Sequence, residues 1–224
     1  IVDGTSGDII YEHLAVNKRL LPNHNSDGST WMRLWSMSKL VTISLAMDLI
    51  EEGLFYLDDP VHKYIPEFSN LMVAVDSNGE SISRSRNEDL DCPHDLVNMD
   101  SVMTVQHLFN HTAGFYYALT SSKCLNEELG SNKLLQAESG NQLINLLSTL
   151  PLIPHPGETY FYGFNTSVLG LLLERVTGTS LRQIFIDRIE KPTKLKGLTF
   201  TKPKGIELLP TFTGRDGNLR EIID

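Results

Sequence analysis

The chain has 224 residues, of which 41% are apolar, 21% charged and 8% aromatic, as in an ordinary globular protein long enough for one or two packed domains. Its formal net charge of −9 argues against nucleic acid or an anionic membrane as the main partner. No apolar run reaches the length of a membrane span. The two cysteines, Cys92 and Cys124, lie in loop-like sequence and form either one disulfide or two free thiols, which leaves the redox compartment open.

Both ends of the chain resemble parts of elements that have been cut. Residues 1–11 have the pattern of a strand, a glycine-containing turn and a second strand, as though they began within a hairpin. Residues 214–224 contain another turn and stop soon after it. Because two strands alone are only marginally stable in water, we expect a sheet seeded here to need further strands.

A serine and a lysine open the next predicted element, a helix that runs to about Glu52. Apolar residues between Leu40 and Ile50 recur at helical spacing over most of the circumference, which predicts a helix buried on nearly all sides. Ser36 suits its N-cap or first turn, and Gly53 is a suitable stop. Because Ser36 and Lys39 are three residues apart, they share a helix face with Cβ atoms about 5–6 Å apart.

The Ser36–Lys39 pair has two interpretations. A hydroxyl is a poor nucleophile until a neighbouring base takes its proton, and pairing with lysine is one known solution. However, Ser-x-x-Lys arises by chance on the order of once per few hundred residues. From these residues alone, an N-cap serine followed by an exposed lysine therefore remains open.

The remaining elements are mostly helical. After Pro60 we expect a short helix or turn over 61–68, and residues 72–100 form a long polar connection that is either a functional loop or a mobile excursion. Further helices are predicted over 102–110, 141–150, 167–176 and 181–189.

Two histidines have the spacing of metal ligands. His107 and His111 are four residues apart on a predicted helix, but no glutamate follows His107 and no third ligand is evident. We therefore interpret His111 as a helix-end residue that holds the turn over 112–114. A metal hydrolase would require activity that a chelator abolishes.

Several segments, in this order, resemble the serine β-lactamase-related superfamily. The likeness is closest to class C β-lactamases, D-alanyl-D-alanine carboxypeptidases and the esterases and acyltransferases that share their fold. Arg33-Leu34-Trp35-Ser36-Met37-Ser38-Lys39 resembles the Ser-x-x-Lys element of that superfamily. The other similar segments are 58–68, 104–115 with its His-Thr-Ala-Gly, 156–162 and 169–178.

The resemblance implies an α/β (α+β) fold, with an antiparallel sheet flanked by helices and a mostly α-helical region. Residues 1–59 would form the first part of the α/β domain with the nucleophile helix. Residues 60–190 would form the helical region, and 191–224 would return to an incomplete α/β domain. The C-terminal strands would be missing from this chain.

The resemblance also implies a site. Ser36 would be the acylated nucleophile of a serine hydrolase or acyltransferase acting on a small-molecule ester or amide, with Lys39 and Tyr162 as the proton-transfer pair. No cofactor and no metal are implied, and we expect neither a nucleic-acid partner nor a membrane span. The alternative is a family member that lacks activity and serves in binding or assembly.

Four aromatic or amide side chains are candidate substrate-binding residues. Phe164 and Asn165 would form the wall of the cleft, and Tyr116 and Tyr117 would line the acyl pocket. Ordinary core packing is the alternative for all four.

The chain departs from the superfamily pattern at two places. The tyrosine element is usually Tyr-x-Asn, whereas here Phe164 stands between Tyr162-Gly163 and Asn165, which favours an ester or amide over a β-lactam. The third element, Lys-Thr-Gly or His-x-Gly on a strand, is not evident in its usual place. We expect it beyond Asp224, on a second chain or fragment that completes the fold, or not at all, and the second oxyanion donor would come with it.

Proton transfer at this site needs assistance from its surroundings. Free lysine and tyrosine both have pKa values near 10, so service as a base near pH 7 costs roughly 4–5 kcal/mol. Burial alone raises the pKa of a tyrosine, whereas a cation beside it favours the phenolate. We therefore expect Tyr162 to depend on a nearby positive charge.

Overall fold

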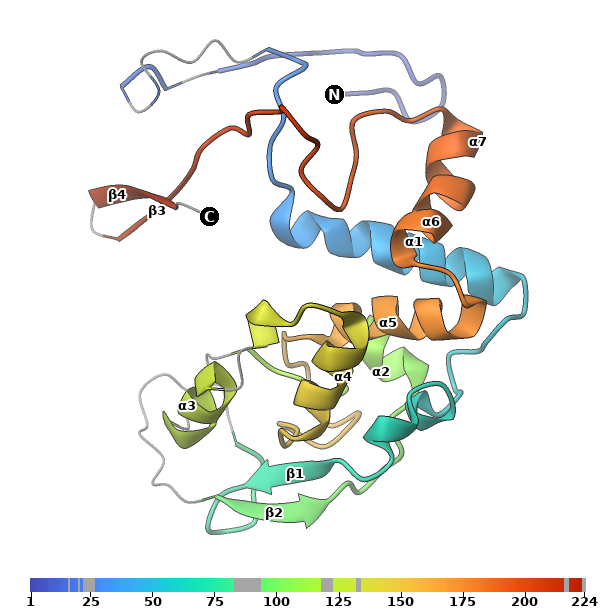
Figure 1. Ribbon diagram of the computed structural model, residues 1–224, viewed down its shortest axis with the longest axis vertical. Helices are drawn as coiled ribbons and strands as arrows, with labels where there is room; N and C mark the ends of the chain where they lie inside the picture. Colours follow the sequence, from blue (N-terminus) through green and yellow to red (C-terminus); the bar gives the residue numbers. More distant parts are fainter. Residues whose placement is uncertain are drawn as a thin grey trace. The chain divides into compact units, whose positions relative to one another are not determined.

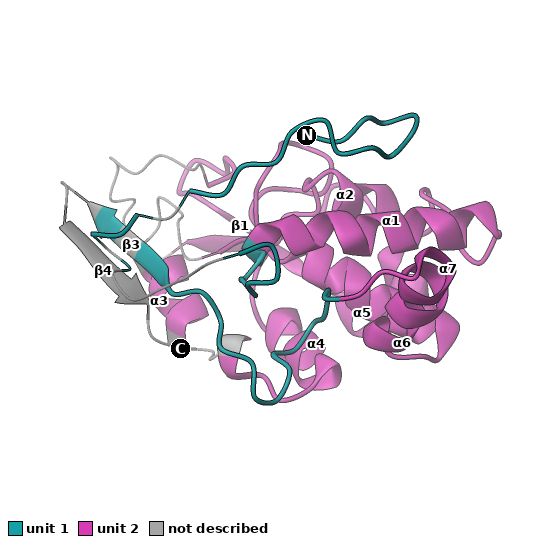
Figure 2. Ribbon diagram, turned by 90° about the horizontal axis from the view of Figure 1, so that it is seen from above, with its two compact units in different colours: residues 1–35, 197–224 teal, residues 36–196 magenta. Residues whose placement is uncertain are grey.

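A computed structural model describes residues 1–15, 17–19, 21, 27–82, 94–117, 123–131, 134–215 and 218–222 (Figure 1). The chain forms two compact units, one of residues 1–35 with 197–224 and one of residues 36–196 (Figure 2). The helix that follows Ser36 belongs to the second unit. Within the described residues, no helix is long and apolar enough to cross a membrane.

The first unit contains both ends of the chain. Val2 and Ile9 form an isolated antiparallel bridge around a turn in which Gly7 has a φ of 77°. Strands β3 (Thr211–Arg215) and β4 (Asn218–Ile222) pair antiparallel, with Thr211 opposite Ile222. The predicted opening hairpin is therefore present as a single bridge rather than as two strands.

The second unit begins at Ser36, within the 3₁₀ turn η1 (Trp35–Met37), which is followed by helix α1 (Ser38–Glu51). The helix ends at the predicted stop, where the Gly53 N–H donates to the Ile50 carbonyl at 2.8 Å. Its buried residues, Thr42, Leu45, Ala46 and Leu49, lie on one face. Leu40 is 68% exposed, so the prediction of burial on nearly all sides is wrong. The spacing of apolar residues predicts a helix, but it does not predict which of its faces pack against another element.

Helix α1 packs against α5 (Asn165–Thr177) and α6 (Leu181–Phe185), and α5 also packs against α2 (Val105–Phe109) (Figure 1). Helix α5 is mostly buried and ends at Gly178, whose φ of 66° suits a glycine cap. The predicted helix at 181–189 is present as α6, a π-helical turn over Ile186–Glu190, and α7 (Lys191–Thr193). The second unit also contains η2 (Val61–Lys63), η3 (Pro66–Phe68), α3 (Lys123–Ser131), η4 (Leu134–Gln136) and α4 (Gly140–Ser148).

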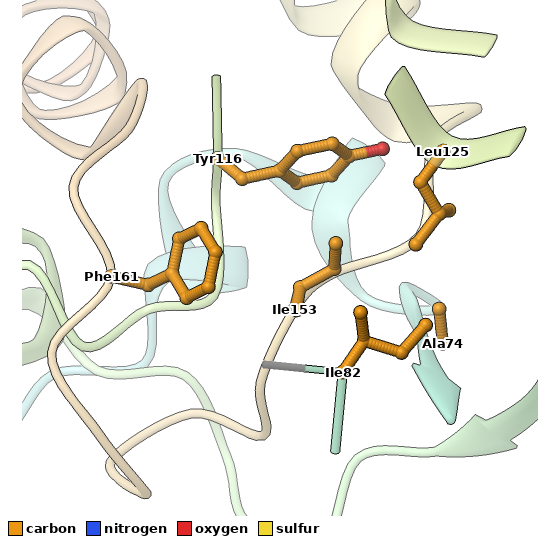
Figure 3. Packing of buried hydrophobic residues seen from close by; sticks show 6 residues of the cluster. All are labelled: Ala74, Ile82, Tyr116, Leu125, Ile153 and Phe161. Atoms are coloured by element: carbon orange, nitrogen blue, oxygen red, sulfur yellow. The ribbon is translucent and has the colours of Figure 1, made fainter. Parts of the chain in front are cut away.

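The long polar connection is not wholly irregular. Its ends form strands β1 (Met72–Val75) and β2 (Asp95–Asn98), which pair antiparallel with Met72 opposite Asn98. Residues 83–93 lie outside the described residues. A core cluster adjoins this sheet, and Figure 3 shows its members: Ala74, Ile82, Tyr116, Leu125, Ile153 and Phe161. Cys124 is disulfide-bonded, and Cys92, the only other cysteine, lies outside the described residues.

Candidate active site

The Ser36–Lys39 contact is local. Ser36 is exposed in η1, and Lys39 follows it in the first turn of α1. The Lys39 ammonium donates to Ser36 Oγ at 3.1 Å. A spacing of three residues brings two side chains to one helix face, so the geometry follows from the sequence spacing.

Tyr162 reaches the serine from a segment that is held by backbone hydrogen bonds. The Phe161 N–H donates to the His111 carbonyl at 2.7 Å, and the Gly157 N–H donates to the Thr112 carbonyl at 2.8 Å. A Cβ atom at Gly163 would overlap the carbonyl of Phe115, so this approach requires a glycine. The His-Thr-Ala-Gly segment is therefore the support on which the tyrosine segment lies.

The side chains of Ser36, Lys39 and Tyr162 lie close together around Ser36 Oγ. The Tyr162 hydroxyl lies 2.6 Å from Ser36 Oγ, although the two residues are 126 positions apart in the chain. Lys39 Nζ lies 4.9 Å from the centroid of the Tyr162 ring, within the range of a cation–π contact. The Ser36 hydroxyl, the Tyr162 phenol and the Lys39 ammonium therefore lie close enough for hydrogen bonds and charge interactions.

The surroundings of Tyr162 favour its phenolate. Burial acts to raise the pKa of its phenol, but hydrogen bonds with Lys39 and Ser36, together with the positive charge of Lys39, lower that pKa below its ordinary value. Tyr117 responds in the opposite way, because burial raises its pKa despite the proximity of Lys39. Of the two phenols beside Lys39, Tyr162 is thus the one that ionises more readily to a phenolate.

The structure places the four candidate substrate-binding residues differently. The ring of Tyr117 is half-buried and packs edge-on against Phe164, with centroids 4.6 Å apart, and against Tyr162 at 5.6 Å. Phe164 is 5% exposed, Tyr116 2% and Asn165 0%, which favours the packing alternative for these three. Substrate contact by any of the four residues stays a prediction.

The two histidines have separate polar partners. His107 Nδ1 accepts the Thr104 backbone N–H at 3.2 Å, and both ring nitrogens of His111 face side chains of α5. Among the described residues, no group of three or more potential metal ligands lies together. His111 instead stacks on the Tyr162 ring, with centroids 4.9 Å apart and an interplanar angle of 25°. The sequence predicts His111 as a turn residue and does not predict this contact, for which the His-Thr-Ala-Gly motif is the available signal.

Comparisons with known proteins agree on the family. The Beta-lactamase family profile matches residues 5–218. The chain is 29% identical over 198 residues to ML-236A carboxylate methylbutanoyltransferase of Penicillium citrinum, a match that covers 85% of this chain and 44% of that protein. The chain thus spans less than half the length of this curated relative.

Two solved structures have the same fold. Simvastatin synthase (LovD) from Aspergillus terreus matches with a TM-score of 0.65 and 27% identity, over 87% of this chain and 46% of that one. EstCE1, a hydrolase with promiscuous acyltransferase activity, matches with a TM-score of 0.73 and 24% identity, over 97% of this chain and 52% of that one. The mixed fold of helices and antiparallel sheet expected from the sequence is thereby confirmed, and the chain belongs to the beta-lactamase family.

Proposed function

We propose that this chain carries the nucleophile and base of a serine hydrolase or acyltransferase that acts on an ester or amide through an acyl-enzyme on Ser36. The observation that carries the proposal is the 2.6 Å contact between the Tyr162 hydroxyl and Ser36 Oγ beside the Lys39 ammonium. Relatives that are named acyltransferases and hydrolases support the same reaction class.

In the acylation step, the Tyr162 phenolate takes the proton of the Ser36 hydroxyl. Ser36 Oγ then forms a bond to the acyl carbon of the substrate, and the bond from that carbon to the leaving oxygen or nitrogen breaks. Tyr162 returns its proton to the leaving group, so the phenolate is restored. The positive charge of Lys39 stabilises the phenolate.

Deacylation repeats these events with another nucleophile. Water or an acceptor alcohol gives its proton to Tyr162 and attacks the acyl carbon, and Ser36 Oγ leaves and recovers the proton. Water yields hydrolysis and an alcohol yields acyl transfer. The Ser36 backbone N–H is the expected oxyanion donor on this chain, and a second donor stays a prediction. Because loss of one such donor typically costs about 10²–10³ in rate, acylation by a reactive probe is a more direct test than turnover.

The test is covalent labelling with a fluorophosphonate, followed by mass mapping of the adduct. We expect one adduct on Ser36 in the wild type and none in Ser36→Ala. Ser38→Ala is the matched control, because Ser38 lies two residues away on the exposed side of the same turn. If the wild type acquires no adduct, or if Ser36→Ala is labelled equally, the proposal fails and a binding or assembly role takes its place.

A further inference from the structure

His111 lies in an unusual position for a residue that merely ends a helix. Its side chain is 8% exposed, and its φ of 59° lies in the left-handed region, which non-glycine residues seldom adopt. Its ring is stacked nearly parallel on the ring of Tyr162. The strained backbone thus orients an aromatic ring against the side chain that acts as base in the proposed function.

Two residues at the start of α5 hold the imidazole. The Asn165 amide nitrogen lies 3.1 Å from His111 Nδ1, and Thr166 Oγ lies 3.3 Å from Nε2. The same amide nitrogen donates to the carbonyls of Phe115 at 3.3 Å and Phe161 at 3.2 Å. Because carbonyl oxygens only accept, the amide must present its N–H groups on this side.

The orientation of the amide determines the form of the imidazole. An Asn165 N–H that points toward His111 requires Nδ1 to accept, so the ring proton lies on Nε2, next to the Thr166 hydroxyl. Protonation of Nδ1 would place two donors against each other in a buried place. The hydrogen bonds therefore select a neutral imidazole with one orientation.

The backbone ties the two stacked residues together as well. The His111 carbonyl accepts the N–H of Phe161, the residue just before Tyr162. Asn165, three residues after Tyr162, reaches back to His111 through its side chain. His111 thus contacts the tyrosine segment before Tyr162, at its ring and after it.

We propose that His111 is a positioning residue for Tyr162, whose phenol it holds against Ser36 through a stacked neutral ring fixed by Asn165 and Thr166. This inference rests on the proposed function of Tyr162. Misplacement of a catalytic group by about 1 Å can cost on the order of 10²-fold in rate. The expected loss is in the maximal rate of acylation, because the contacts of the probe with the protein are unchanged.

Two variants separate the ring from its hydrogen bonds. His111→Asn keeps an amide that can accept from Asn165 and tolerates a positive φ, but it removes the ring. His111→Phe keeps a flat ring and removes both ring nitrogens. We expect His111→Asn to lower the limiting rate of Ser36 labelling by about 10–100-fold at an unchanged half-saturating probe concentration. We expect His111→Phe, which keeps a flat ring but loses the hydrogen bonds with Asn165 and Thr166, to lower the rate by less than His111→Asn does. Tyr160→Phe is the control, because Tyr160 also packs beside His111 and the phenylalanine of this variant keeps the aromatic ring there.

NMR of the chain with ¹³C-labelled tyrosine reports on the stack directly. A purely structural role of His111 would not produce a shift of the Tyr162 resonances in one variant that the other variant reverses. Loss of the imidazole ring current should shift the ring resonances of Tyr162 in His111→Asn, and the ring in His111→Phe should restore most of the shift. The inference is overturned if folded His111→Asn labels at the wild-type limiting rate, or if folded His111→Phe labels as slowly as Tyr162→Phe. If His111→Asn does not fold, the outcome with His111→Phe decides. Failure of the proposed function would appear separately, as wild-type protein without a Ser36 adduct, while the NMR shift still tests the stack.

Discussion

Two lysines in the second unit lie over tyrosine rings at nearly the same distance. Lys39 Nζ is 4.9 Å from the Tyr162 centroid, and Lys63 Nζ is 5.0 Å from the Tyr64 centroid. The pKa of Tyr162 is nevertheless lowered, whereas the pKa of Tyr64 is raised. A cation over a ring therefore does not by itself make a base.

The difference lies in the third group at each place. The Tyr64 hydroxyl donates to the Asp59 carboxylate at 2.6 Å, and Lys63 donates to the same carboxylate at 2.8 Å. Burial raises the pKa of Tyr64, and the hydrogen bond to Asp59 and the negative charge of Asp59 raise it further against the opposing effect of Lys63. The same carboxylate raises the pKa of Lys63 to about 12. At Tyr162 the third group is the Ser36 hydroxyl, which is uncharged and can give up its own proton.

The largest expected effect comes from removal of the phenol oxygen of Tyr162, and the same change at Tyr64 is the comparison. Tyr162→Phe removes the proton acceptor, so the rate of Ser36 labelling by a fluorophosphonate should fall by about 10²–10⁴-fold. Tyr64→Phe should leave that rate unchanged, because its hydroxyl is bonded to Asp59 and not to Ser36. Equal losses in the two variants, measured on folded protein, would contradict the distinction between the sites.

Removal of each lysine tests the role of the cation. In the proposed mechanism the phenolate is the active form, so labelling should increase with pH as Tyr162 loses its proton. Lys39→Met removes a hydrogen bond and a charge that lower the pKa of Tyr162, so a smaller fraction is ionised at neutral pH. The rising limb of the pH–rate profile should therefore move to higher pH.

Lys63→Met is the matched control, because it removes a cation in the same geometry over another ring. Its pH–rate profile should coincide with that of the wild type. A Lys39→Met profile whose limb stays in place or moves to lower pH would show that Lys39 does not stabilise the phenolate.

The two sites differ in how far sequence predicts them. The contact of Ser36 with Lys39 follows from a helical spacing of three. Tyr162 is 126 residues away from Ser36, and only the resemblance to a known superfamily indicated that it reaches the serine. Asp59 and Lys63 have an i, i+4 spacing that is compatible with an ion pair, but spacing alone does not indicate that Tyr64 joins them.

Burial was the least predictable property. The resemblance predicts Asn165 as a cleft residue, whereas the structure buries its side chain, and its amide binds His111 and two carbonyls. Strands β1 and β2 lie at the ends of a polar connection in which apolar and polar residues alternate only weakly. Their pairing therefore depends on the neighbouring segment at Leu152. Tertiary neighbours, which a local pattern does not contain, decide both cases.

A smaller effect is expected when the carboxylate is removed from the second site. Asp59→Asn keeps an acceptor for the Tyr56 N–H but removes the charge beside Tyr64. The pKa of Tyr64 should then fall relative to the wild type, and titration of ¹³C-labelled tyrosine by NMR measures the change. Asp58→Asn, at the exposed neighbouring position, should have no such effect. A Tyr64 pKa that stays in place in Asp59→Asn would mean that burial alone raises it.

The smallest effect is expected at a third tyrosine, which has neither arrangement. Tyr116 points its ring into the core cluster (Figure 3), and among the described residues its hydroxyl has no hydrogen-bond partner. Burial raises the pKa of this phenol, and the negative charge of Glu128 adds to the shift, so Tyr116 stays protonated. A buried hydroxyl without a partner costs about 1–3 kcal/mol.

Tyr116→Phe should therefore leave the free energy of unfolding unchanged or raise it by about 1 kcal/mol, as measured by denaturant titration. The rate of Ser36 labelling should also stay the same, because the ring still fills its place beside Ile153 and Leu125. A slower labelling rate with unchanged stability would instead assign the hydroxyl to the acyl pocket. Burial without a cation beside the phenol thus leaves Tyr116 a packing residue, whereas the cation and the serine hydroxyl beside Tyr162 support its proposed role as the base that takes the Ser36 proton.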